Sequence, residues 1–120
     1  MKVLNWGGLS ILPFLFTLMI VGCDKKANSE KPLSALESSG KAVYMSNCIA
    51  CHNPDPRIAG SVGPDVAFSS LELVTARVLR AEYPAGYKPK RESKMMPPLT
   101  HLEKDIPAIH AYLNSFPKNN

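Results

Sequence analysis

The sequence predicts one small, mainly α-helical domain in which three to four short helices are joined by long loops. Three segments carry apolar residues at helical spacing, and each begins with a serine or threonine followed three residues later by a glutamate. The segments between them are rich in proline and glycine, which interrupt helices. The three segments begin at Ser34, Ser69 and Thr100.

The first predicted helix opens at a capping box formed by Ser34 and Glu37 and leads into Cys48. Met45 within it is interpreted as core filling, the commonest role of a buried methionine. The residues at helical spacing are Leu36, Gly40, Val43, Tyr44 and Asn47.

The second predicted helix covers residues 71–82, with Ser69 and Glu72 as its capping box. Its apolar face consists of Leu71, Val74 and Val78. The dipeptide Tyr83-Pro84 ends it, because the residue before a proline disfavours helical backbone.

The last predicted helix starts at Thr100 or at Asp105 and runs to about residue 116. Pro107 fits its first turn if Asp105 is the N-cap, whereas it would kink a longer helix from Thr100. The apolar stripe comprises Ile106, Ile109, Tyr112, Leu113 and Phe116.

Cys48, Cys51 and His52 form a Cys-x-x-Cys-His run, the attachment signature of c-type haem. One helical turn presents all three on one face, so that both thiols can bond the two vinyl groups and the imidazole can ligate the iron. The alternatives are half of a zinc site and a disulfide or redox pair. A zinc site needs further ligands, and the chain has no second cysteine pair and only two other histidines, His101 and His110.

Together with this run, two upstream residues resemble the class I cytochromes c. Gly40 and Tyr44 lie eight and four residues before Cys48. In that family a glycine and an aromatic at these offsets let the N-terminal helix cross the C-terminal helix closely, since glycine has no Cβ and the ring fills the adjacent groove. The resemblance covers residues 34–117 and implies a cytochrome c fold wrapped around one covalently attached haem.

The resemblance also implies a supporting role for the Gly63-Pro64 dipeptide. Pro64 lies twelve residues after His52. In class I cytochromes the carbonyl of such a proline accepts the Nδ1 proton of the haem-ligating histidine, which fixes the ring and raises its basicity. Pro64 is therefore expected to support His52 through its backbone.

A methionine directly before a proline is commonly the second axial ligand in this family, which points to Met96 before Pro97. A thioether binds haem iron and raises its reduction potential relative to a second histidine. Met95 is the runner-up for this position, and His101 is a further alternative close to the same loop.

Residues 1–22 are predicted to be a lipoprotein signal peptide. The apolar run Leu9–Val21 is short for a membrane span, and a small residue precedes Cys23, which is followed at once by charge. This resembles a bacterial lipobox, whose cysteine is lipidated and becomes the first mature residue; an uncleaved anchor is the alternative. Residues 23–33 then form a lipid-anchored flexible tether, and residues 34–120 the cytochrome c domain.

Removal of 22 residues from 120 leaves 98, with 13 basic and 10 acidic side chains. A net charge of +3 is not the footprint of a nucleic-acid-binding protein. One local cluster of basic side chains stands out. We interpret it either as a docking patch for an acidic redox partner or as an ordinary solvated loop. Its members are Lys88, Lys90, Arg91 and Lys94.

The resemblance to class I cytochromes c implies a protein that transfers electrons through one haem c with His/Met ligation and is not an enzyme. The resemblance to a lipobox implies that it faces the periplasm from a lipid-anchored position on a bacterial membrane. Its expected partners are an electron donor and an electron acceptor. The protein is then either a monomeric carrier or a subunit of a larger respiratory or dehydrogenase complex. The alternative from another class is a haem enzyme or sensor, which requires an open sixth position on the iron.

Overall fold

The computed structural model describes residues 31–118, which form three α-helices and one 3₁₀ helix. In chain order they are α1 (Ala35–Asn47), α2 (Leu71–Arg80), the 3₁₀ helix η1 (Thr100–Asp105) and α3 (Ile106–Leu113). No strand occurs among the described residues, and the predicted mainly α fold is confirmed. The predicted signal peptide, Cys23 and most of the predicted tether lie outside the described residues.

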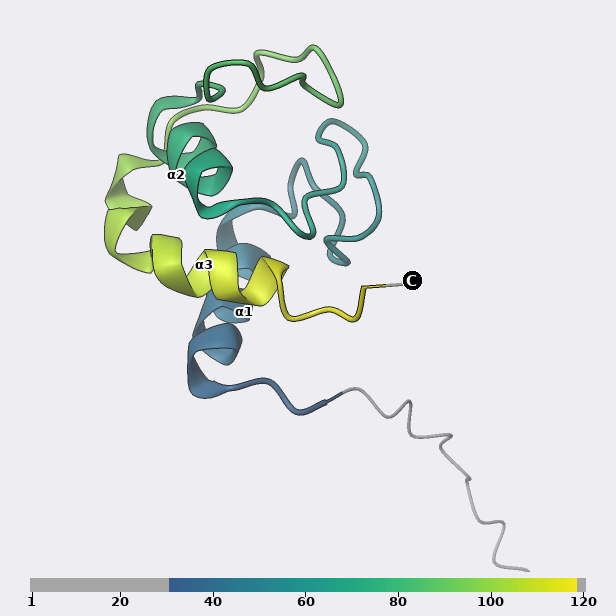
Figure 1. Ribbon diagram of the computed structural model, residues 1–120, viewed down its shortest axis with the longest axis vertical. Helices are drawn as coiled ribbons and strands as arrows, with labels where there is room; N and C mark the ends of the chain where they lie inside the picture. The colour runs from purple at the N-terminus through teal and green to yellow at the C-terminus, as the bar shows by residue number, and fades with distance from the viewer. Residues whose placement is uncertain (1–30, 119–120) are drawn as a thin grey trace, which may run out of the picture. The chain divides into compact units, whose positions relative to one another are not determined.

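The packing of α3 across α1 forms the centre of the structure, while α2 packs against α3 and η1 (Figure 1). The two helices approach so closely that a Cβ added to Gly40 would lie 1.9 Å from the carbonyl oxygen of Ala108. One turn further along, the Tyr44 and Tyr112 rings pack with their centroids 5.5 Å apart. The close crossing expected from Gly40 and Tyr44 is therefore present.

The capping of α1 follows the sequence prediction. The Ser34 hydroxyl accepts a hydrogen bond from the Glu37 amide at 3.2 Å, and the Glu37 carboxylate accepts one from the Ser34 amide at 2.6 Å. Two backbone amides that a helix start leaves unpaired are thereby satisfied. Because the Ser34 amide bonds the charged form of the carboxyl group, it holds the pKa of Glu37 below its usual value.

The capping predicted for α2 is wrong by one residue. Ser70 is the N-cap, and its hydroxyl accepts from the Leu73 amide at 3.2 Å. The Ser69 hydroxyl instead donates to the Val66 carbonyl at 2.7 Å. With two consecutive serines, a Ser-x-x-Glu spacing alone does not determine which one caps.

The end of α2 is also earlier than predicted, at Arg80 rather than at residue 82. Ala81 adopts a left-handed conformation (φ 55°), and the Glu82 amide donates to the Ala76 carbonyl at 3.2 Å. A left-handed residue that closes the last turn in this way terminates a helix before any proline does so.

The alternative starts of the last helix are both represented in the structure. Residues 100–105 form η1, and α3 follows without a break, with Pro107 in its first turn. A proline there costs no hydrogen bond, because its missing N–H has no partner within the helix. The helix ends at Leu113 rather than near 116, and Phe116 folds back onto Tyr112 with ring centroids 5.5 Å apart.

Three residues predicted to lie on buried faces are exposed. Leu36 is 51% exposed because it lies a turn before the crossing at Gly40, and Met45 is 37% exposed. Met45 is rotated by about 100° from the buried Tyr44 around the helix. Leu71, in the first turn of α2, is 48% exposed. The core consists of Tyr44, Val74, Val78, Leu102, Ile106, Ile109, Tyr112 and Leu113.

No helix in the described part of the chain is long and apolar enough to cross a bilayer.

Candidate functional site

A cavity of about 300 Å³ lies between the Cys-x-x-Cys-His turn, α2 and the loop that precedes η1. Most of its lining is apolar. The residues that matter most for its chemistry are Cys48, Cys51, His52 and Met96. The structure thus brings the whole predicted haem-binding set, drawn from positions 48 to 96, to one cavity. We call residues 48–66 the His segment and residues 84–99 the Met segment.

The Cys-x-x-Cys-His run continues α1 by one further turn. The Cys48 amide donates to the Tyr44 carbonyl at 2.9 Å, and the His52 amide donates to the Cys48 carbonyl at 2.9 Å. The Cys51 amide donates to the same Cys48 carbonyl at 3.2 Å. This is the single turn that the haem signature requires, and Cys48, Cys51 and His52 all line the cavity.

The zinc and redox-thiol interpretations gain no support from this geometry. Burial raises the pKa of the Cys48 thiol to about 11, and a thiol that stays protonated is a poor nucleophile and a poor metal ligand. Within residues 31–118, no cluster of three or more histidine, cysteine or acidic side chains is arranged to hold a metal ion.

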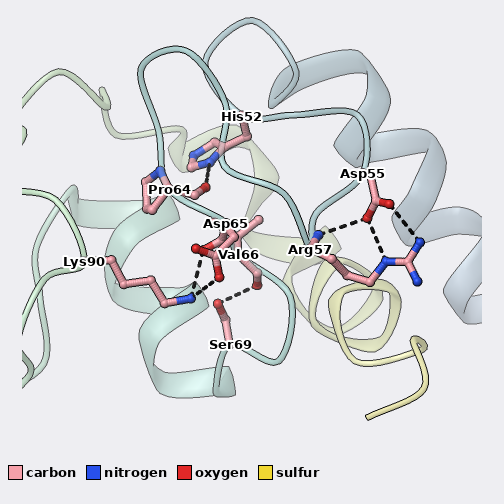
Figure 2. Close-up of polar contacts among 8 residues, drawn as sticks. All are labelled: His52, Asp55, Arg57, Pro64, Asp65, Val66, Ser69 and Lys90. Atoms are coloured by element: carbon pink, nitrogen blue, oxygen red, sulfur yellow. Dashed lines mark hydrogen bonds and ion pairs between the residues drawn. The ribbon is translucent and has the colours of Figure 1, made fainter. Parts of the chain in front are cut away.

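His52 is oriented by the backbone of Pro64. Its Nδ1 lies 2.9 Å from the Pro64 carbonyl oxygen (Figure 2). A carbonyl accepts hydrogen bonds and cannot donate, so Nδ1 carries the proton and Nε2 of the neutral ring keeps its lone pair for a metal. The contact is the one that the resemblance implied for Pro64.

The residue before Pro64 explains how the chain comes so close to the imidazole. A Cβ on Gly63 would lie 2.4 Å from Cε1 of His52, so only glycine leaves room for the ring. Gly60 is constrained in the same way, since its Cβ would lie 2.3 Å from the Cys51 carbonyl oxygen. The Gly63 amide donates to that carbonyl at 2.9 Å. The loop therefore lies directly on the Cys-x-x-Cys-His turn.

The Met segment presents one of its two methionines to the cavity. Met96 is half-buried, lines the cavity and packs against the core, whereas Met95 is 72% exposed. The segment is attached just beyond Met96, where the Leu99 amide donates to the Val78 carbonyl of α2 at 2.6 Å. His101 is exposed and does not line the cavity.

Three further cavity residues were not found from the sequence. The Arg77 guanidinium lies 4.2 Å from the ring centroid of Tyr83, and the Tyr83 and Tyr87 rings stack with centroids 5.4 Å apart. All three line the cavity. Arg77 follows Val74 by three residues on α2, so the buried face of that helix could have indicated it. The two tyrosines belong to no periodic pattern.

Two members of the basic cluster, Lys90 and Arg91, bind the chain's own His segment. The Lys90 ammonium forms an ion pair with the Asp65 carboxylate and donates to the Asp65 carbonyl at 3.1 Å (Figure 2). The Arg91 guanidinium donates to the carbonyls of Gly60 and Val62 at 3.1 and 3.2 Å. Lys88 and Lys94, the other two members, are exposed. The cluster is therefore neither a uniform docking patch nor a purely solvated loop.

Comparison with known proteins agrees with the interpretation of this cavity as a haem site. Residues 38–117, more than half of the chain, match the family described as Cytochrome c. No curated protein and no solved structure matched significantly. The matched residues contain most of α1, the Cys-x-x-Cys-His turn, the Met segment and α3. The chain therefore belongs to the cytochrome c family, whose members carry out electron transfer with a covalently bound haem c.

Proposed function

We propose that this protein carries single electrons through one haem c, with His52 and Met96 as axial ligands, and works from the periplasmic face of a bacterial membrane. Cys23 is its lipid attachment site, and residues 23–33 are the tether. The protein is an electron carrier and not an enzyme, because two protein ligands leave no position at the iron for a substrate.

The observation that carries this proposal is the contrast between the two neighbouring methionines. Met96 lines the same cavity as Cys48, Cys51 and His52, whereas Met95 is 72% exposed. A thioether side chain at an apolar cavity that also holds a histidine with a free lone pair is the donor set of a high-potential haem. This supports Met96, and it disfavours an open sixth position.

The residues that line the cavity fit a covalently bound haem c. Cys48 and Cys51 would hold it through thioether bonds, and the apolar walls would exclude water from it. Bound haem c supplies one-electron chemistry between ferric and ferrous iron. The His52–Pro64 hydrogen bond fixes the tautomer and orientation of the imidazole and raises its basicity. Fixed ligands favour fast electron transfer, because little has to rearrange when the charge changes.

Substitution of each methionine in turn tests the ligand assignment. We expect Met96→Ala to keep its covalent haem, to lose the weak red absorption band of ferric Met–iron ligation, and to bind cyanide readily. The reduction potential should fall, because thioether ligation raises it. The matched control is Met95→Ala, one residue away, which should keep the band because its side chain is exposed.

Three outcomes would contradict the proposal. If Met95→Ala loses the band instead, the axial ligand is Met95 and not Met96. If neither variant loses it, His101 becomes the leading candidate and the high potential is no longer expected. If the wild-type protein binds cyanide as readily as Met96→Ala does, the site is open and the protein belongs with haem enzymes or sensors.

The membrane attachment is tested separately at Cys23, which lies outside the described residues. Cys23→Ser should remove the lipid and either block processing or release the haem domain into the soluble periplasmic fraction. Fractionation of cells and the mass of the mature N-terminus measure this. Wild-type protein that is fully soluble, with no lipid mass, would contradict the anchor.

A further inference from the structure

The His and Met segments are joined by two cationic side chains, Lys90 and Arg91. Lys90 contacts both the carboxylate and the carbonyl of Asp65, the residue after the carbonyl that orients His52. Arg91 bridges the carbonyls of Gly60 and Val62. Both cations therefore bind the loop of residues 60–65, which packs on the Cys-x-x-Cys-His turn through Gly60, Gly63 and Pro64. We call these contacts the 90–91 clasp.

The clasp lies close to Met96 in the chain. Arg91 is five residues before Met96, and the next attachment, the Leu99–Val78 hydrogen bond, is three residues after it. Met96 is thus on a segment held at both ends. The local hydrogen bonds on the N-terminal side, from Tyr87 to Pro84 and from Ser93 to Arg91, stay within the Met segment and attach it to nothing else.

The side chains in the clasp are accessible to solvent. Those of Lys90 and Asp65 are 46% and 40% exposed. Exposed ion pairs contribute little to the stability of a whole domain, because water and salt screen them. The same ion pair is a larger fraction of the free energy of opening one loop, because a loop opens locally at a much smaller cost than the whole domain unfolds. The clasp is therefore placed to control opening of the Met segment and not global folding.

We propose that Lys90 and Arg91 are positioning residues that hold the Met segment closed, so that Met96 stays on the iron. The proposal rests on the proposed function, because it takes Met96 as the ligand. It gives two of the four clustered cations a role inside the molecule and leaves Lys88 and Lys94 as the solvated members.

Loop length gives the scale of the effect. With the clasp, the span that is unattached before Leu99 is seven residues, 92–98; without it, the span is at least eleven residues, 88–98. The entropic cost of closing that longer span, together with the lost ion pair and hydrogen bonds, should raise the open population by about three- to tenfold.

The test compares two double variants of the full-length holoprotein that remove equal charge from the same loop. Lys90→Ala/Arg91→Ala removes the clasp, and Lys88→Ala/Lys94→Ala is the matched control. The rate at which cyanide displaces the ligand of the ferric protein reports opening of the Met segment, and far-ultraviolet circular dichroism during heating reports the global fold. The wild-type protein and Met96→Ala provide the closed and open reference rates.

We expect the clasp variant to bind cyanide about three- to tenfold faster than the wild-type protein. The control should bind at the wild-type rate, and all three should unfold at similar temperatures. Equal rates in the two double variants, with a wild-type Met–iron band, would overturn the clasp and leave the proposed function intact. A wild-type protein that lacks the band and binds cyanide as fast as Met96→Ala would overturn both.

Discussion

The His segment is held by its own backbone, whereas the Met segment is held largely by side chains. In the His segment, backbone hydrogen bonds join residues far apart in sequence, from Gly63 to Cys51 and from Val66 to Pro56. In the Met segment, backbone hydrogen bonds form only local turns, except at Leu99, whose amide donates to a carbonyl of α2. The histidine side of the cavity is therefore built into the fold, while the methionine side depends on contacts that single substitutions remove.

The glycines of the two segments show the same difference. Added Cβ atoms on Gly60 and Gly63 would collide with the Cys-x-x-Cys-His turn, at 2.3 and 2.4 Å. Gly86 in the Met segment has a left-handed φ of 76°, yet nothing lies within 4 Å of its Cβ position. Glycine is required by close packing on one side of the cavity and by backbone conformation alone on the other.

The largest effect on stability is expected where α1, which comes just before the His segment in the chain, crosses α3. Gly40→Ala should lower the free energy of unfolding by at least about 2 kcal/mol, because the new Cβ overlaps the Ala108 carbonyl and forces α1 from α3. Urea unfolding of the holoprotein measures this. The control Gly86→Ala meets no atoms and should cost about 1 kcal/mol for its φ alone. Equal losses in the two variants would mean that the crossing can relax freely.

A smaller effect is expected next to the histidine. Gly63→Ala should cost about 1–3 kcal/mol and displace the imidazole from Pro64, since the Cβ would lie 2.4 Å from the ring. The reduction potential should change as well, because the hydrogen bond to Pro64 raises the basicity of His52, the proposed axial ligand. An unchanged potential in a folded variant would show that the His segment is not as rigid as its contacts indicate.

The smallest expected effect is a pH dependence of the protein's stability that arises from an ion pair in the His segment. The Arg57 guanidinium bonds the Asp55 carboxylate at 2.8 and 2.9 Å and holds the pKa of that carboxyl below its usual value of 3.8. A lowered pKa stabilises the folded protein above about pH 4, and this contribution disappears as the pH falls through the folded-state pKa. The stability difference between wild type and Asp55→Asn should shrink correspondingly below about pH 4. A difference independent of pH would contradict the ion pair.

The sequence was sufficient for what depends on local spacing and insufficient for what depends on distant contacts. The capping box at Ser34, the turn at Cys48 and the crossing at Gly40 follow from offsets of a few residues. The Ser69 prediction failed because two adjacent serines compete for one cap. The Lys90–Asp65 and Arg91–Gly60 contacts join residues 25 and 31 positions apart on two irregular loops, which no periodicity encodes.

Burial was predicted less well than helix position. Tyr44 was placed correctly, but Leu36, Met45 and Leu71 are exposed, because a helical stripe does not show how far the partner element extends along it. For the two methionines, the Met-Pro pattern favoured Met96, and the structure adds that Met96 lines the cavity while Met95 is exposed.

Native-state hydrogen exchange of the holoprotein tests most directly whether the two sides of the cavity are held differently. All the amides to compare are hydrogen-bonded: those of Cys51 and Gly63 in the His segment, and those of Tyr87 and Ser93 in the Met segment. We expect the first pair to exchange near the free energy of global unfolding and the second pair at least about 2 kcal/mol below it, through local opening. Equal opening free energies for the two pairs would contradict the difference between the two segments.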